Sequence, residues 1–144
     1  MKNKIFVGEF IGSALLVMAI VGSGIMAESL TNDTAVMLLA NAVATGAALY
    51  FLIVSISDIS GAHFNPFVTL AMYLSKKIKS QLLPVYFTAQ ILGCLTGVML
   101  ANFFFDYSLI ELSSKSRSGI NVFVSEIIAT FGLIFIIFRT IKGG

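Results

Sequence analysis

The sequence has few of the residues from which metal sites and acid–base catalysts are built. Its 144 residues include one histidine, one cysteine, no tryptophan and seven acidic side chains. A single cysteine cannot form an internal disulfide, and Cys94 lies inside an apolar stretch, where a small buried residue is the ordinary interpretation. The acidic residues and the histidine form no cluster along the chain. We therefore expect no metal, no cofactor and no enzymatic activity.

Charge is also scarce. Charged residues make up 11% of the chain and hydrophobic residues 58%, and the mean hydropathy is +0.98. A soluble domain carries roughly 25% charged residues, because it needs them to cover its surface. The net charge of +2 gives no reason to expect a nucleic-acid partner. The length fits one domain, and the composition predicts that this domain lies in a lipid bilayer.

Four stretches are long and apolar enough to cross a membrane, which takes roughly 20 residues. They are residues 5–27, 35–56, 82–105 and 119–138. The first could also be read as a signal peptide, but Glu9 early in the apolar run and the bulky Ile25 near the possible cleavage site favour a retained helix. A fifth apolar segment, 66–74, is too short to cross, so it lies on the surface or is re-entrant. The sequence predicts an all-α membrane protein with four spans and one half-helix.

The basic residues predict the orientation of the spans. Two basic residues precede the first span, three follow the short segment and two follow the fourth span: Lys2, Lys4, Lys76, Lys77, Lys79, Arg139 and Lys142. All seven lie on one side, taken as the cytoplasm, if the short segment enters and leaves on that side. The loop with Lys115 and Arg117 then lies outside. This pattern favours a re-entrant segment and a cytoplasmic N-terminus in a cell membrane.

The first and fourth spans open with similar residues. Residues 9–13 read Glu-Phe-Ile-Gly-Ser and residues 126–130 read Glu-Ile-Ile-Ala-Thr. The two spans run in opposite directions, which is the arrangement of an inverted repeat in transport proteins. We expect a first repeat over residues 1–118, with three spans and a half-helix at 65–75. A second repeat would begin at 119–144 and be cut off after its first span.

Residues 60–69 read Ser-Gly-Ala-His-Phe-Asn-Pro-Phe-Val-Thr and carry the strongest signal. Asn65 is a good N-cap and Pro66 is favoured at the first helical position, so the short helix should begin there. Capping would fix the Asn65 amide and leave its NH₂ group as a donor. The preceding residues Gly61, Ala62 and His63 should be non-helical, with their carbonyl groups along a protein or water surface. With the positive end of the half-helix dipole, this predicts a polar single-file path for neutral molecules.

This stretch resembles the major intrinsic protein family, the aquaporins and glycerol facilitators. Nine of the ten positions fit the motif of the family's first half, and the exception is Phe67 where the family has Ala. The resemblance extends over the whole chain and includes Gln90 with Gly93 and Gly97. It implies an aquaporin-like right-handed bundle of six spans, with two half-helices that meet at their Asn-Pro motifs, assembled as a homotetramer. The second half-helix and its filter arginine are not among these residues.

The resemblance also implies roles for single residues. Glu9 and Glu126 would each brace the irregular loop beside a half-helix, and carboxylates inside a membrane are functional by default. Thr45 falls where water-selective members have a filter Phe, and a one-residue gap would place Ala44 or Gly46 there instead. All three are small and would widen the opening. We expect Phe67 to pack against protein and leave the path open.

Two glycine pairs are expected to allow close helix crossing, Gly8 with Gly12 and Gly93 with Gly97. The function predicted from all of this is passive transport of water or small neutral solutes such as glycerol, urea or metalloid hydroxides, complete only with the missing half. One alternative is a non-conducting, truncated membrane subunit that assembles with other proteins. A secondary transporter is less favoured, because the membrane spans offer only the two glutamates as coupling-ion ligands.

Overall fold

The computed structural model describes residues 1–111 and 118–142, and the side chains through residue 140. Within these residues every regular element is a helix, which confirms the predicted all-α class. The helices are α1 (Lys2–Leu30), α2 (Thr34–Ser60), α3 (Pro66–Leu74), the 3₁₀ turn η1 (Ser80–Leu82), α4 (Leu83–Phe104) and α5 (Ile120–Lys142). Four of them are long and apolar enough to span a membrane: α1, α2, η1 with α4, and α5.

The helix ends follow from local chemistry. Asp33 caps α2 by accepting hydrogen bonds from the backbone N–H groups of Ala35 and Val36. Gly61 ends α2 with a left-handed φ of 91°. Helices α1 and α2 extend beyond the predicted apolar stretches at both ends, and α5 does so at its C-terminal end, because polar residues there continue the helical hydrogen bonding. Helix α4 instead lies within the predicted stretch 82–105. Only the short segment has the predicted bounds, at Pro66–Leu74.

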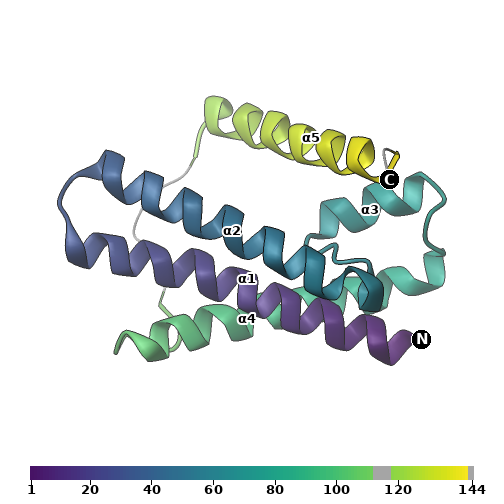
Figure 1. Ribbon diagram of the computed structural model, residues 1–144, viewed down its shortest axis with the longest axis horizontal. Coiled ribbons are helices and arrows are strands. Elements are labelled where there is room, and N and C mark those ends of the chain that lie inside the picture. The colour runs from purple at the N-terminus through teal and green to yellow at the C-terminus, as the bar shows by residue number, and fades with distance from the viewer. Residues whose placement is uncertain (112–117, 143–144) are drawn as a thin grey trace. The chain divides into compact units, whose positions relative to one another are not determined.

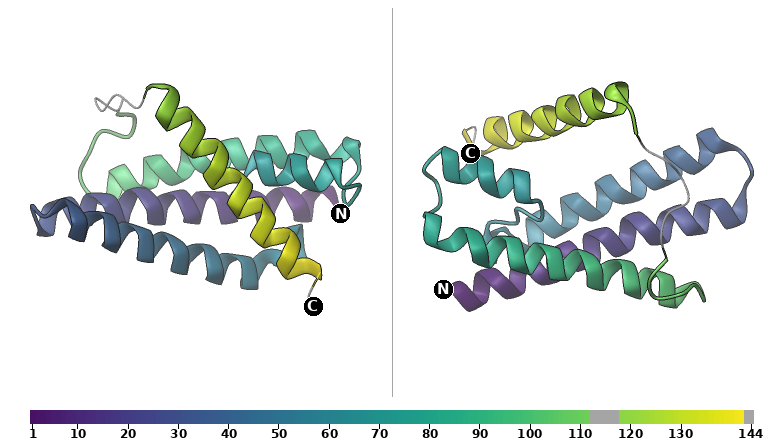
Figure 2. Two further views of the ribbon diagram at one scale, coloured as in Figure 1. Left: turned by 90° about the horizontal axis from the view of Figure 1, so that it is seen from above. Right: turned by 180° about the vertical axis from the view of Figure 1, so that it is seen from behind.

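The chain forms two compact units, residues 1–111 and 112–144. In the first unit α1 lies side by side with both α2 and α4, and α3 packs on α4 (Figures 1 and 2). Glycine makes the contact between α1 and α4 close. A Cβ atom added to Gly93 would lie 2.5 Å from the carbonyl oxygen of Phe10, and one added to Gly97 would overlap the carbonyl oxygen of Ala14. Gly93 and Gly97 therefore lie where two helix backbones meet.

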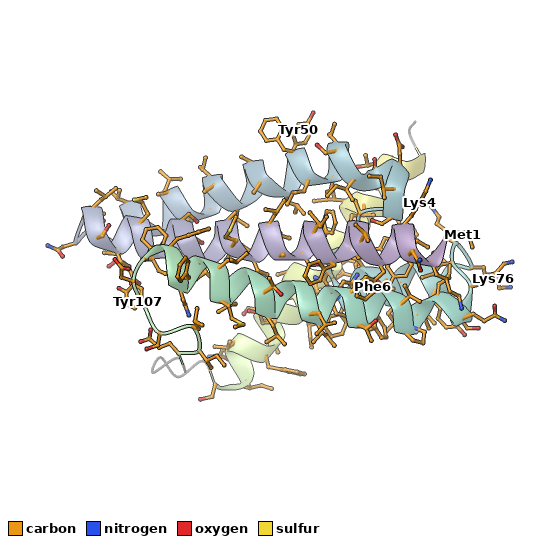
Figure 3. All side chains as sticks on the ribbon, turned by 90° about the horizontal axis from the view of Figure 1, so that it is seen from below. Met1, Lys4, Phe6, Tyr50, Lys76 and Tyr107 are labelled. Atoms are coloured by element: carbon orange, nitrogen blue, oxygen red, sulfur yellow. The ribbon has the colours of Figure 1, made fainter. Side chains whose placement is uncertain are left out.

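The short helix α3 is re-entrant in the first unit. From the end of α2 the chain turns back along the bundle, and α3 returns to the end at which α4 begins (Figure 1). Met1, Lys4 and Lys76 consequently lie at one end of this unit and Tyr107 lies at the other (Figure 3). The common end for the first two basic segments agrees with the predicted orientation. That this end faces the cytoplasm stays a prediction.

The second unit contributes one described helix, α5. Its Glu126 is exposed, and no described residue hydrogen bonds to the carboxylate. Arg139, counted among the seven basic residues, lies in its last turns. Lys115 and Arg117, which the sequence places on the outer side, lie outside the described residues.

Candidate functional site

The loop between α2 and α3 has an unusual backbone. Gly61, Ala62 and Phe64 have φ angles of 91°, 51° and 50°, in the left-handed region that non-glycine residues seldom adopt. Among the described residues, no hydrogen bond is donated to the carbonyl oxygens of residues 61–64. A strained conformation of this kind persists only where its surroundings hold it. The loop therefore has a row of available acceptors and needs an external support.

Glu9 of α1 provides that support. Its Oε1 accepts hydrogen bonds from Ser60 Oγ at 2.7 Å and from the backbone N–H of His63 at 3.0 Å. Its Oε2 accepts from the backbone N–H of Phe64 at 2.8 Å and from Gln90 Nε2 at 2.8 Å. The side chain is 0% exposed. Four neutral donors thus compensate for the desolvation of a buried carboxylate and tie the loop to both α1 and α4.

A second set of contacts joins Gln90 to the start of α3. Gln90 Nε2 also donates to Thr69 Oγ1 at 2.9 Å, and the Thr69 hydroxyl donates to the carbonyl oxygen of Asn65 at 3.2 Å. His63 Nδ1 lies 3.1 Å from the same hydroxyl oxygen. All these contacts are satisfied together when His63 carries its hydrogen on Nδ1, since the hydroxyl has a single hydrogen to donate.

Tyr86 of α4 holds the loop from a third direction. Its hydroxyl donates to the carbonyl oxygen of Ser60 at 2.5 Å. Its ring stacks on the imidazole of His63 with centroids 4.6 Å apart and planes 16° apart. Tyr86 and His63 are both buried. Tyr86 and Thr69 therefore determine the position of the His63 ring, while the backbone N–H of His63 donates to Glu9.

Asn65 and Pro66 begin α3 as their types predict. Asn65 Oδ1 accepts from the backbone N–H of Phe67 at 2.8 Å, and Pro66 occupies the first helical position. No described residue accepts from Asn65 Nδ2, which leaves this NH₂ group available as a donor at the start of α3. Phe67 is 63% exposed. The described residues therefore do not supply the protein surface against which its ring was expected to pack.

Only one member of the first glycine pair lies at a helix crossing, since a Cβ on Gly8 would meet Ser60 and Ile56 of α2. A Cβ on Gly8 would lie 2.9 Å from Ser60 Cβ, and a Cβ on Gly12 would overlap the ring of Phe64. Gly12 thus faces a side chain of the loop, not the backbone of a crossing helix. Two small residues on one helix face indicate that another part of the protein packs closely there. The pattern does not distinguish a helix backbone from a side chain.

Two candidates for the filter position, Thr45 and Gly46, differ in their exposure. The hydroxyl oxygen of Thr45 is buried and has no hydrogen-bond partner among the described residues. The neighbouring Gly46 is exposed, and a Cβ added there would meet nothing within 4 Å. Gly46, an alternative for the filter position, therefore faces open space within this unit. The Thr45 hydroxyl is covered.

Four residues of the site have no role in the sequence-based prediction: Ser60, Phe64, Thr69 and Tyr86. Three of them lie inside the motif, where only the helix start and the carbonyl groups are assigned. Tyr86 lies four residues before Gln90, one helical turn away on the same face of α4. That spacing from a buried polar residue is the one signal in the sequence that points to it.

Comparison with known proteins agrees with this geometry. The family model described as "Major intrinsic protein" matches residues 1–143. The chain is 43% identical over 136 residues to "Aquaglyceroporin AqpS" of Rhizobium meliloti (strain 1021), covering 94% of this chain and 58% of that protein. It is 34% identical over 143 residues to "Probable aquaporin TIP2-2" of Oryza sativa subsp. japonica, covering 95% of this chain and 56% of that protein. The chain spans about half the length of the curated relatives it matches.

Proposed function

Because the chain belongs to the major intrinsic protein family, we propose that it forms the first repeat of a passive membrane channel for water and small neutral solutes. Two of its relatives are named as an aquaglyceroporin and a probable aquaporin. Glycerol, urea and metalloid hydroxides are the solutes that fit this class. The path would be complete only with a second repeat, which supplies the opposing half-helix.

The observation that carries the proposal is the loop between α2 and α3. Its carbonyl groups receive no hydrogen bond from the described residues, and Asn65 offers a donor at the point where α3 begins. Water, alcohols and amides both donate and accept hydrogen bonds. Along such a path, hydrogen bonds to the protein can therefore replace the hydrogen bonds that these molecules make to bulk water. The positive end of the α3 dipole lies beside Asn65 and disfavours cations there. The four donors on Glu9 hold this arrangement in place.

The repeat boundary belongs to the same proposal. We place the first repeat at residues 1–118 and the start of the second at 119–144, with Glu126 in the role of Glu9. The similar residues at 9–13 and 126–130 support this division. In the complete channel Thr45 or Gly46 would line a wide outer opening, and four copies of the channel would assemble in the cell membrane.

The N-terminus and the loop at residues 76–79 would both face the cytoplasm. Single cysteines introduced by Lys2→Cys and Lys77→Cys, in a Cys94→Ala background, test this orientation with an impermeant thiol reagent. Both sites should be labelled only after the cytoplasmic face is opened. Labelling of the two sites from opposite sides would contradict the re-entrant segment as well as the proposed topology.

The transport test separates the two roles of Asn65. Asn65→Asp keeps the acceptor that caps α3 but removes the NH₂ donor. In stopped-flow swelling of vesicles that hold the complete protein, we expect this variant to keep its thermal stability and lose most solute flow. Asn41→Asp is a control for the added negative charge away from the loop. It removes the hydrogen bonds from Asn41 Nδ2 to Ile20 O and Ser23 Oγ, so it should lower the thermal stability and leave the flow through the folded protein unchanged. Unchanged flow in the Asn65 variant removes Asn65 from the pathway.

A second candidate function is a non-conducting subunit that assembles with other membrane proteins. Vesicles that hold residues 1–144 alone decide between the two. No flow, restored when a second repeat is added, supports the channel proposal, whereas no flow with the complete protein supports the alternative. If Phe67→Ala then restores the flow, the ring is a plug and the channel proposal stands.

A further inference from the structure

The two ends of the first unit carry opposite charges. One end holds five lysines and a single acidic residue: Lys2, Lys4, Lys76, Lys77, Lys79 and Asp58. The opposite end holds four described acidic residues: Glu28, Asp33, Asp106 and Glu111. The basic end is the one at which Met1, Lys4 and Lys76 are seen together (Figure 3). It is therefore complementary to an anionic surface.

A groove lies at this basic end, between the first turns of α1 and the last turn of α2. Its volume is about 420 Å³, and it is lined by Asn3, Lys4, Val7 and Ile59. Val7 is 51% exposed and Ile59 is 49% exposed, so they form an apolar floor that the first unit does not cover. Asn3 and Lys4 also line the groove, and their side chains carry an amide and an ammonium group. Lys4 and Val7 are three residues apart on one face of α1, which brings the charged and apolar parts together.

The position of the groove relative to the spans decides which ligand fits it. The groove lies where two membrane-spanning helices end, at the depth at which apolar chains give way to head groups. A free phosphate ion would make no use of the apolar floor, and a zwitterionic lipid would bring a positive group close to Lys4. We propose that this groove binds one anionic phospholipid, with its phosphate at Lys4 and Asn3 and an acyl chain on Val7 and Ile59.

The absence of tryptophan makes the test direct. Ile59→Trp introduces the only tryptophan of the chain, inside the groove. The chain is reconstituted in vesicles that contain brominated phosphatidylglycerol or brominated phosphatidylcholine, and quenching of the fluorescence gives the relative affinity for the two lipids. A basic residue near an anionic membrane surface strengthens binding about five-fold. We expect phosphatidylglycerol to be preferred, and Lys4→Gln to lower the preference about five-fold.

Two controls distinguish a site from a general surface effect. Lys76→Gln removes a charge at the same end, but Lys76 does not line the groove, so this variant should lower the preference less than Lys4→Gln does. Leu39→Trp places the reporter on the exposed face of α2 toward its other end, where Lys4→Gln should have no effect.

Three results would overturn the proposal. Equal quenching by both lipids means non-selective boundary lipid. An effect of Lys76→Gln as large as that of Lys4→Gln means a diffuse surface potential. No quenching by either lipid means that protein covers the groove. Because the readout is binding, it is independent of whether the chain conducts.

Discussion

Replacing Glu9 with Gln should expose one particular backbone amide of the loop. The substitution keeps the volume of the side chain but turns one of its two acceptor atoms into a donor. Each carboxylate oxygen of Glu9 receives one backbone N–H of the loop, from His63 on Oε1 and from Phe64 on Oε2. Whichever way the new amide is placed, one of these N–H groups faces another donor.

The neighbouring side chains decide which placement is preferred. With the new NH₂ group at the position of Oε1, the Ser60 hydroxyl can accept from it and turn its own hydrogen to a carbonyl group of the preceding helical turn, so that the N–H of His63 alone is left without a partner. With the NH₂ group at the position of Oε2, Gln90 must turn over and give up its bond to Thr69, while Phe64 also loses its partner. The first placement sacrifices fewer hydrogen bonds. We therefore expect the amide of His63 to lose protection and that of Phe64 to keep most of it.

The magnitude follows from the cost of an unsatisfied buried donor, about 1–3 kcal/mol. Amide hydrogen exchange of His63, measured by NMR on the chain in nanodiscs, should become about 5- to 150-fold faster. Glu126→Gln is the matched control, because Glu126 is exposed and hydrogen bonds to no described residue. Unchanged exchange at both loop amides would refute the role of Glu9, and an equal loss of protection throughout α1 and α4 would show a global effect instead.

Two further substitutions test the packing around the loop. Gly12→Ala should destabilise the chain by about 1–3 kcal/mol, because its Cβ would overlap the buried ring of Phe64, and Phe64→Leu should recover part of this loss. Gly46→Ala places its Cβ in open space and should leave the thermal midpoint unchanged or raise it. Similar losses of stability in the Gly12 and Gly46 variants would show that the contact with Phe64 is not the cause. Tyr86→Phe should cost about 1 kcal/mol, through the lost bond to Ser60, and an unchanged midpoint would make that bond dispensable.

The local features of this fold are predictable from the sequence, and the long-range contacts are not. The start of α3 at Pro66 follows from two adjacent residue types, since Asn caps a helix and Pro begins one. The partners of Glu9 are 51 to 81 residues away along the chain, and no periodicity or spacing identifies them. The expected bracing role comes from the resemblance to a family. The four donors that perform it are visible only in three dimensions.

The side chains that flank Glu9 and Glu126 differ in size, and this limits how alike the loops of the two proposed repeats can be. In α1 the flanking residues Gly8 and Gly12 leave room for Ser60 and for the ring of Phe64. The corresponding residues of α5, one before and three after Glu126, are Ser125 and Ala129, and each carries a Cβ atom. A Cβ at the position of Gly12 would occupy the space that a phenyl ring needs. If Glu126 ties a second loop as Glu9 ties the first, that loop must have a smaller side chain in the place of Phe64. The two halves of such a pore would then share their hydrogen bonding to a carboxylate but not their packing.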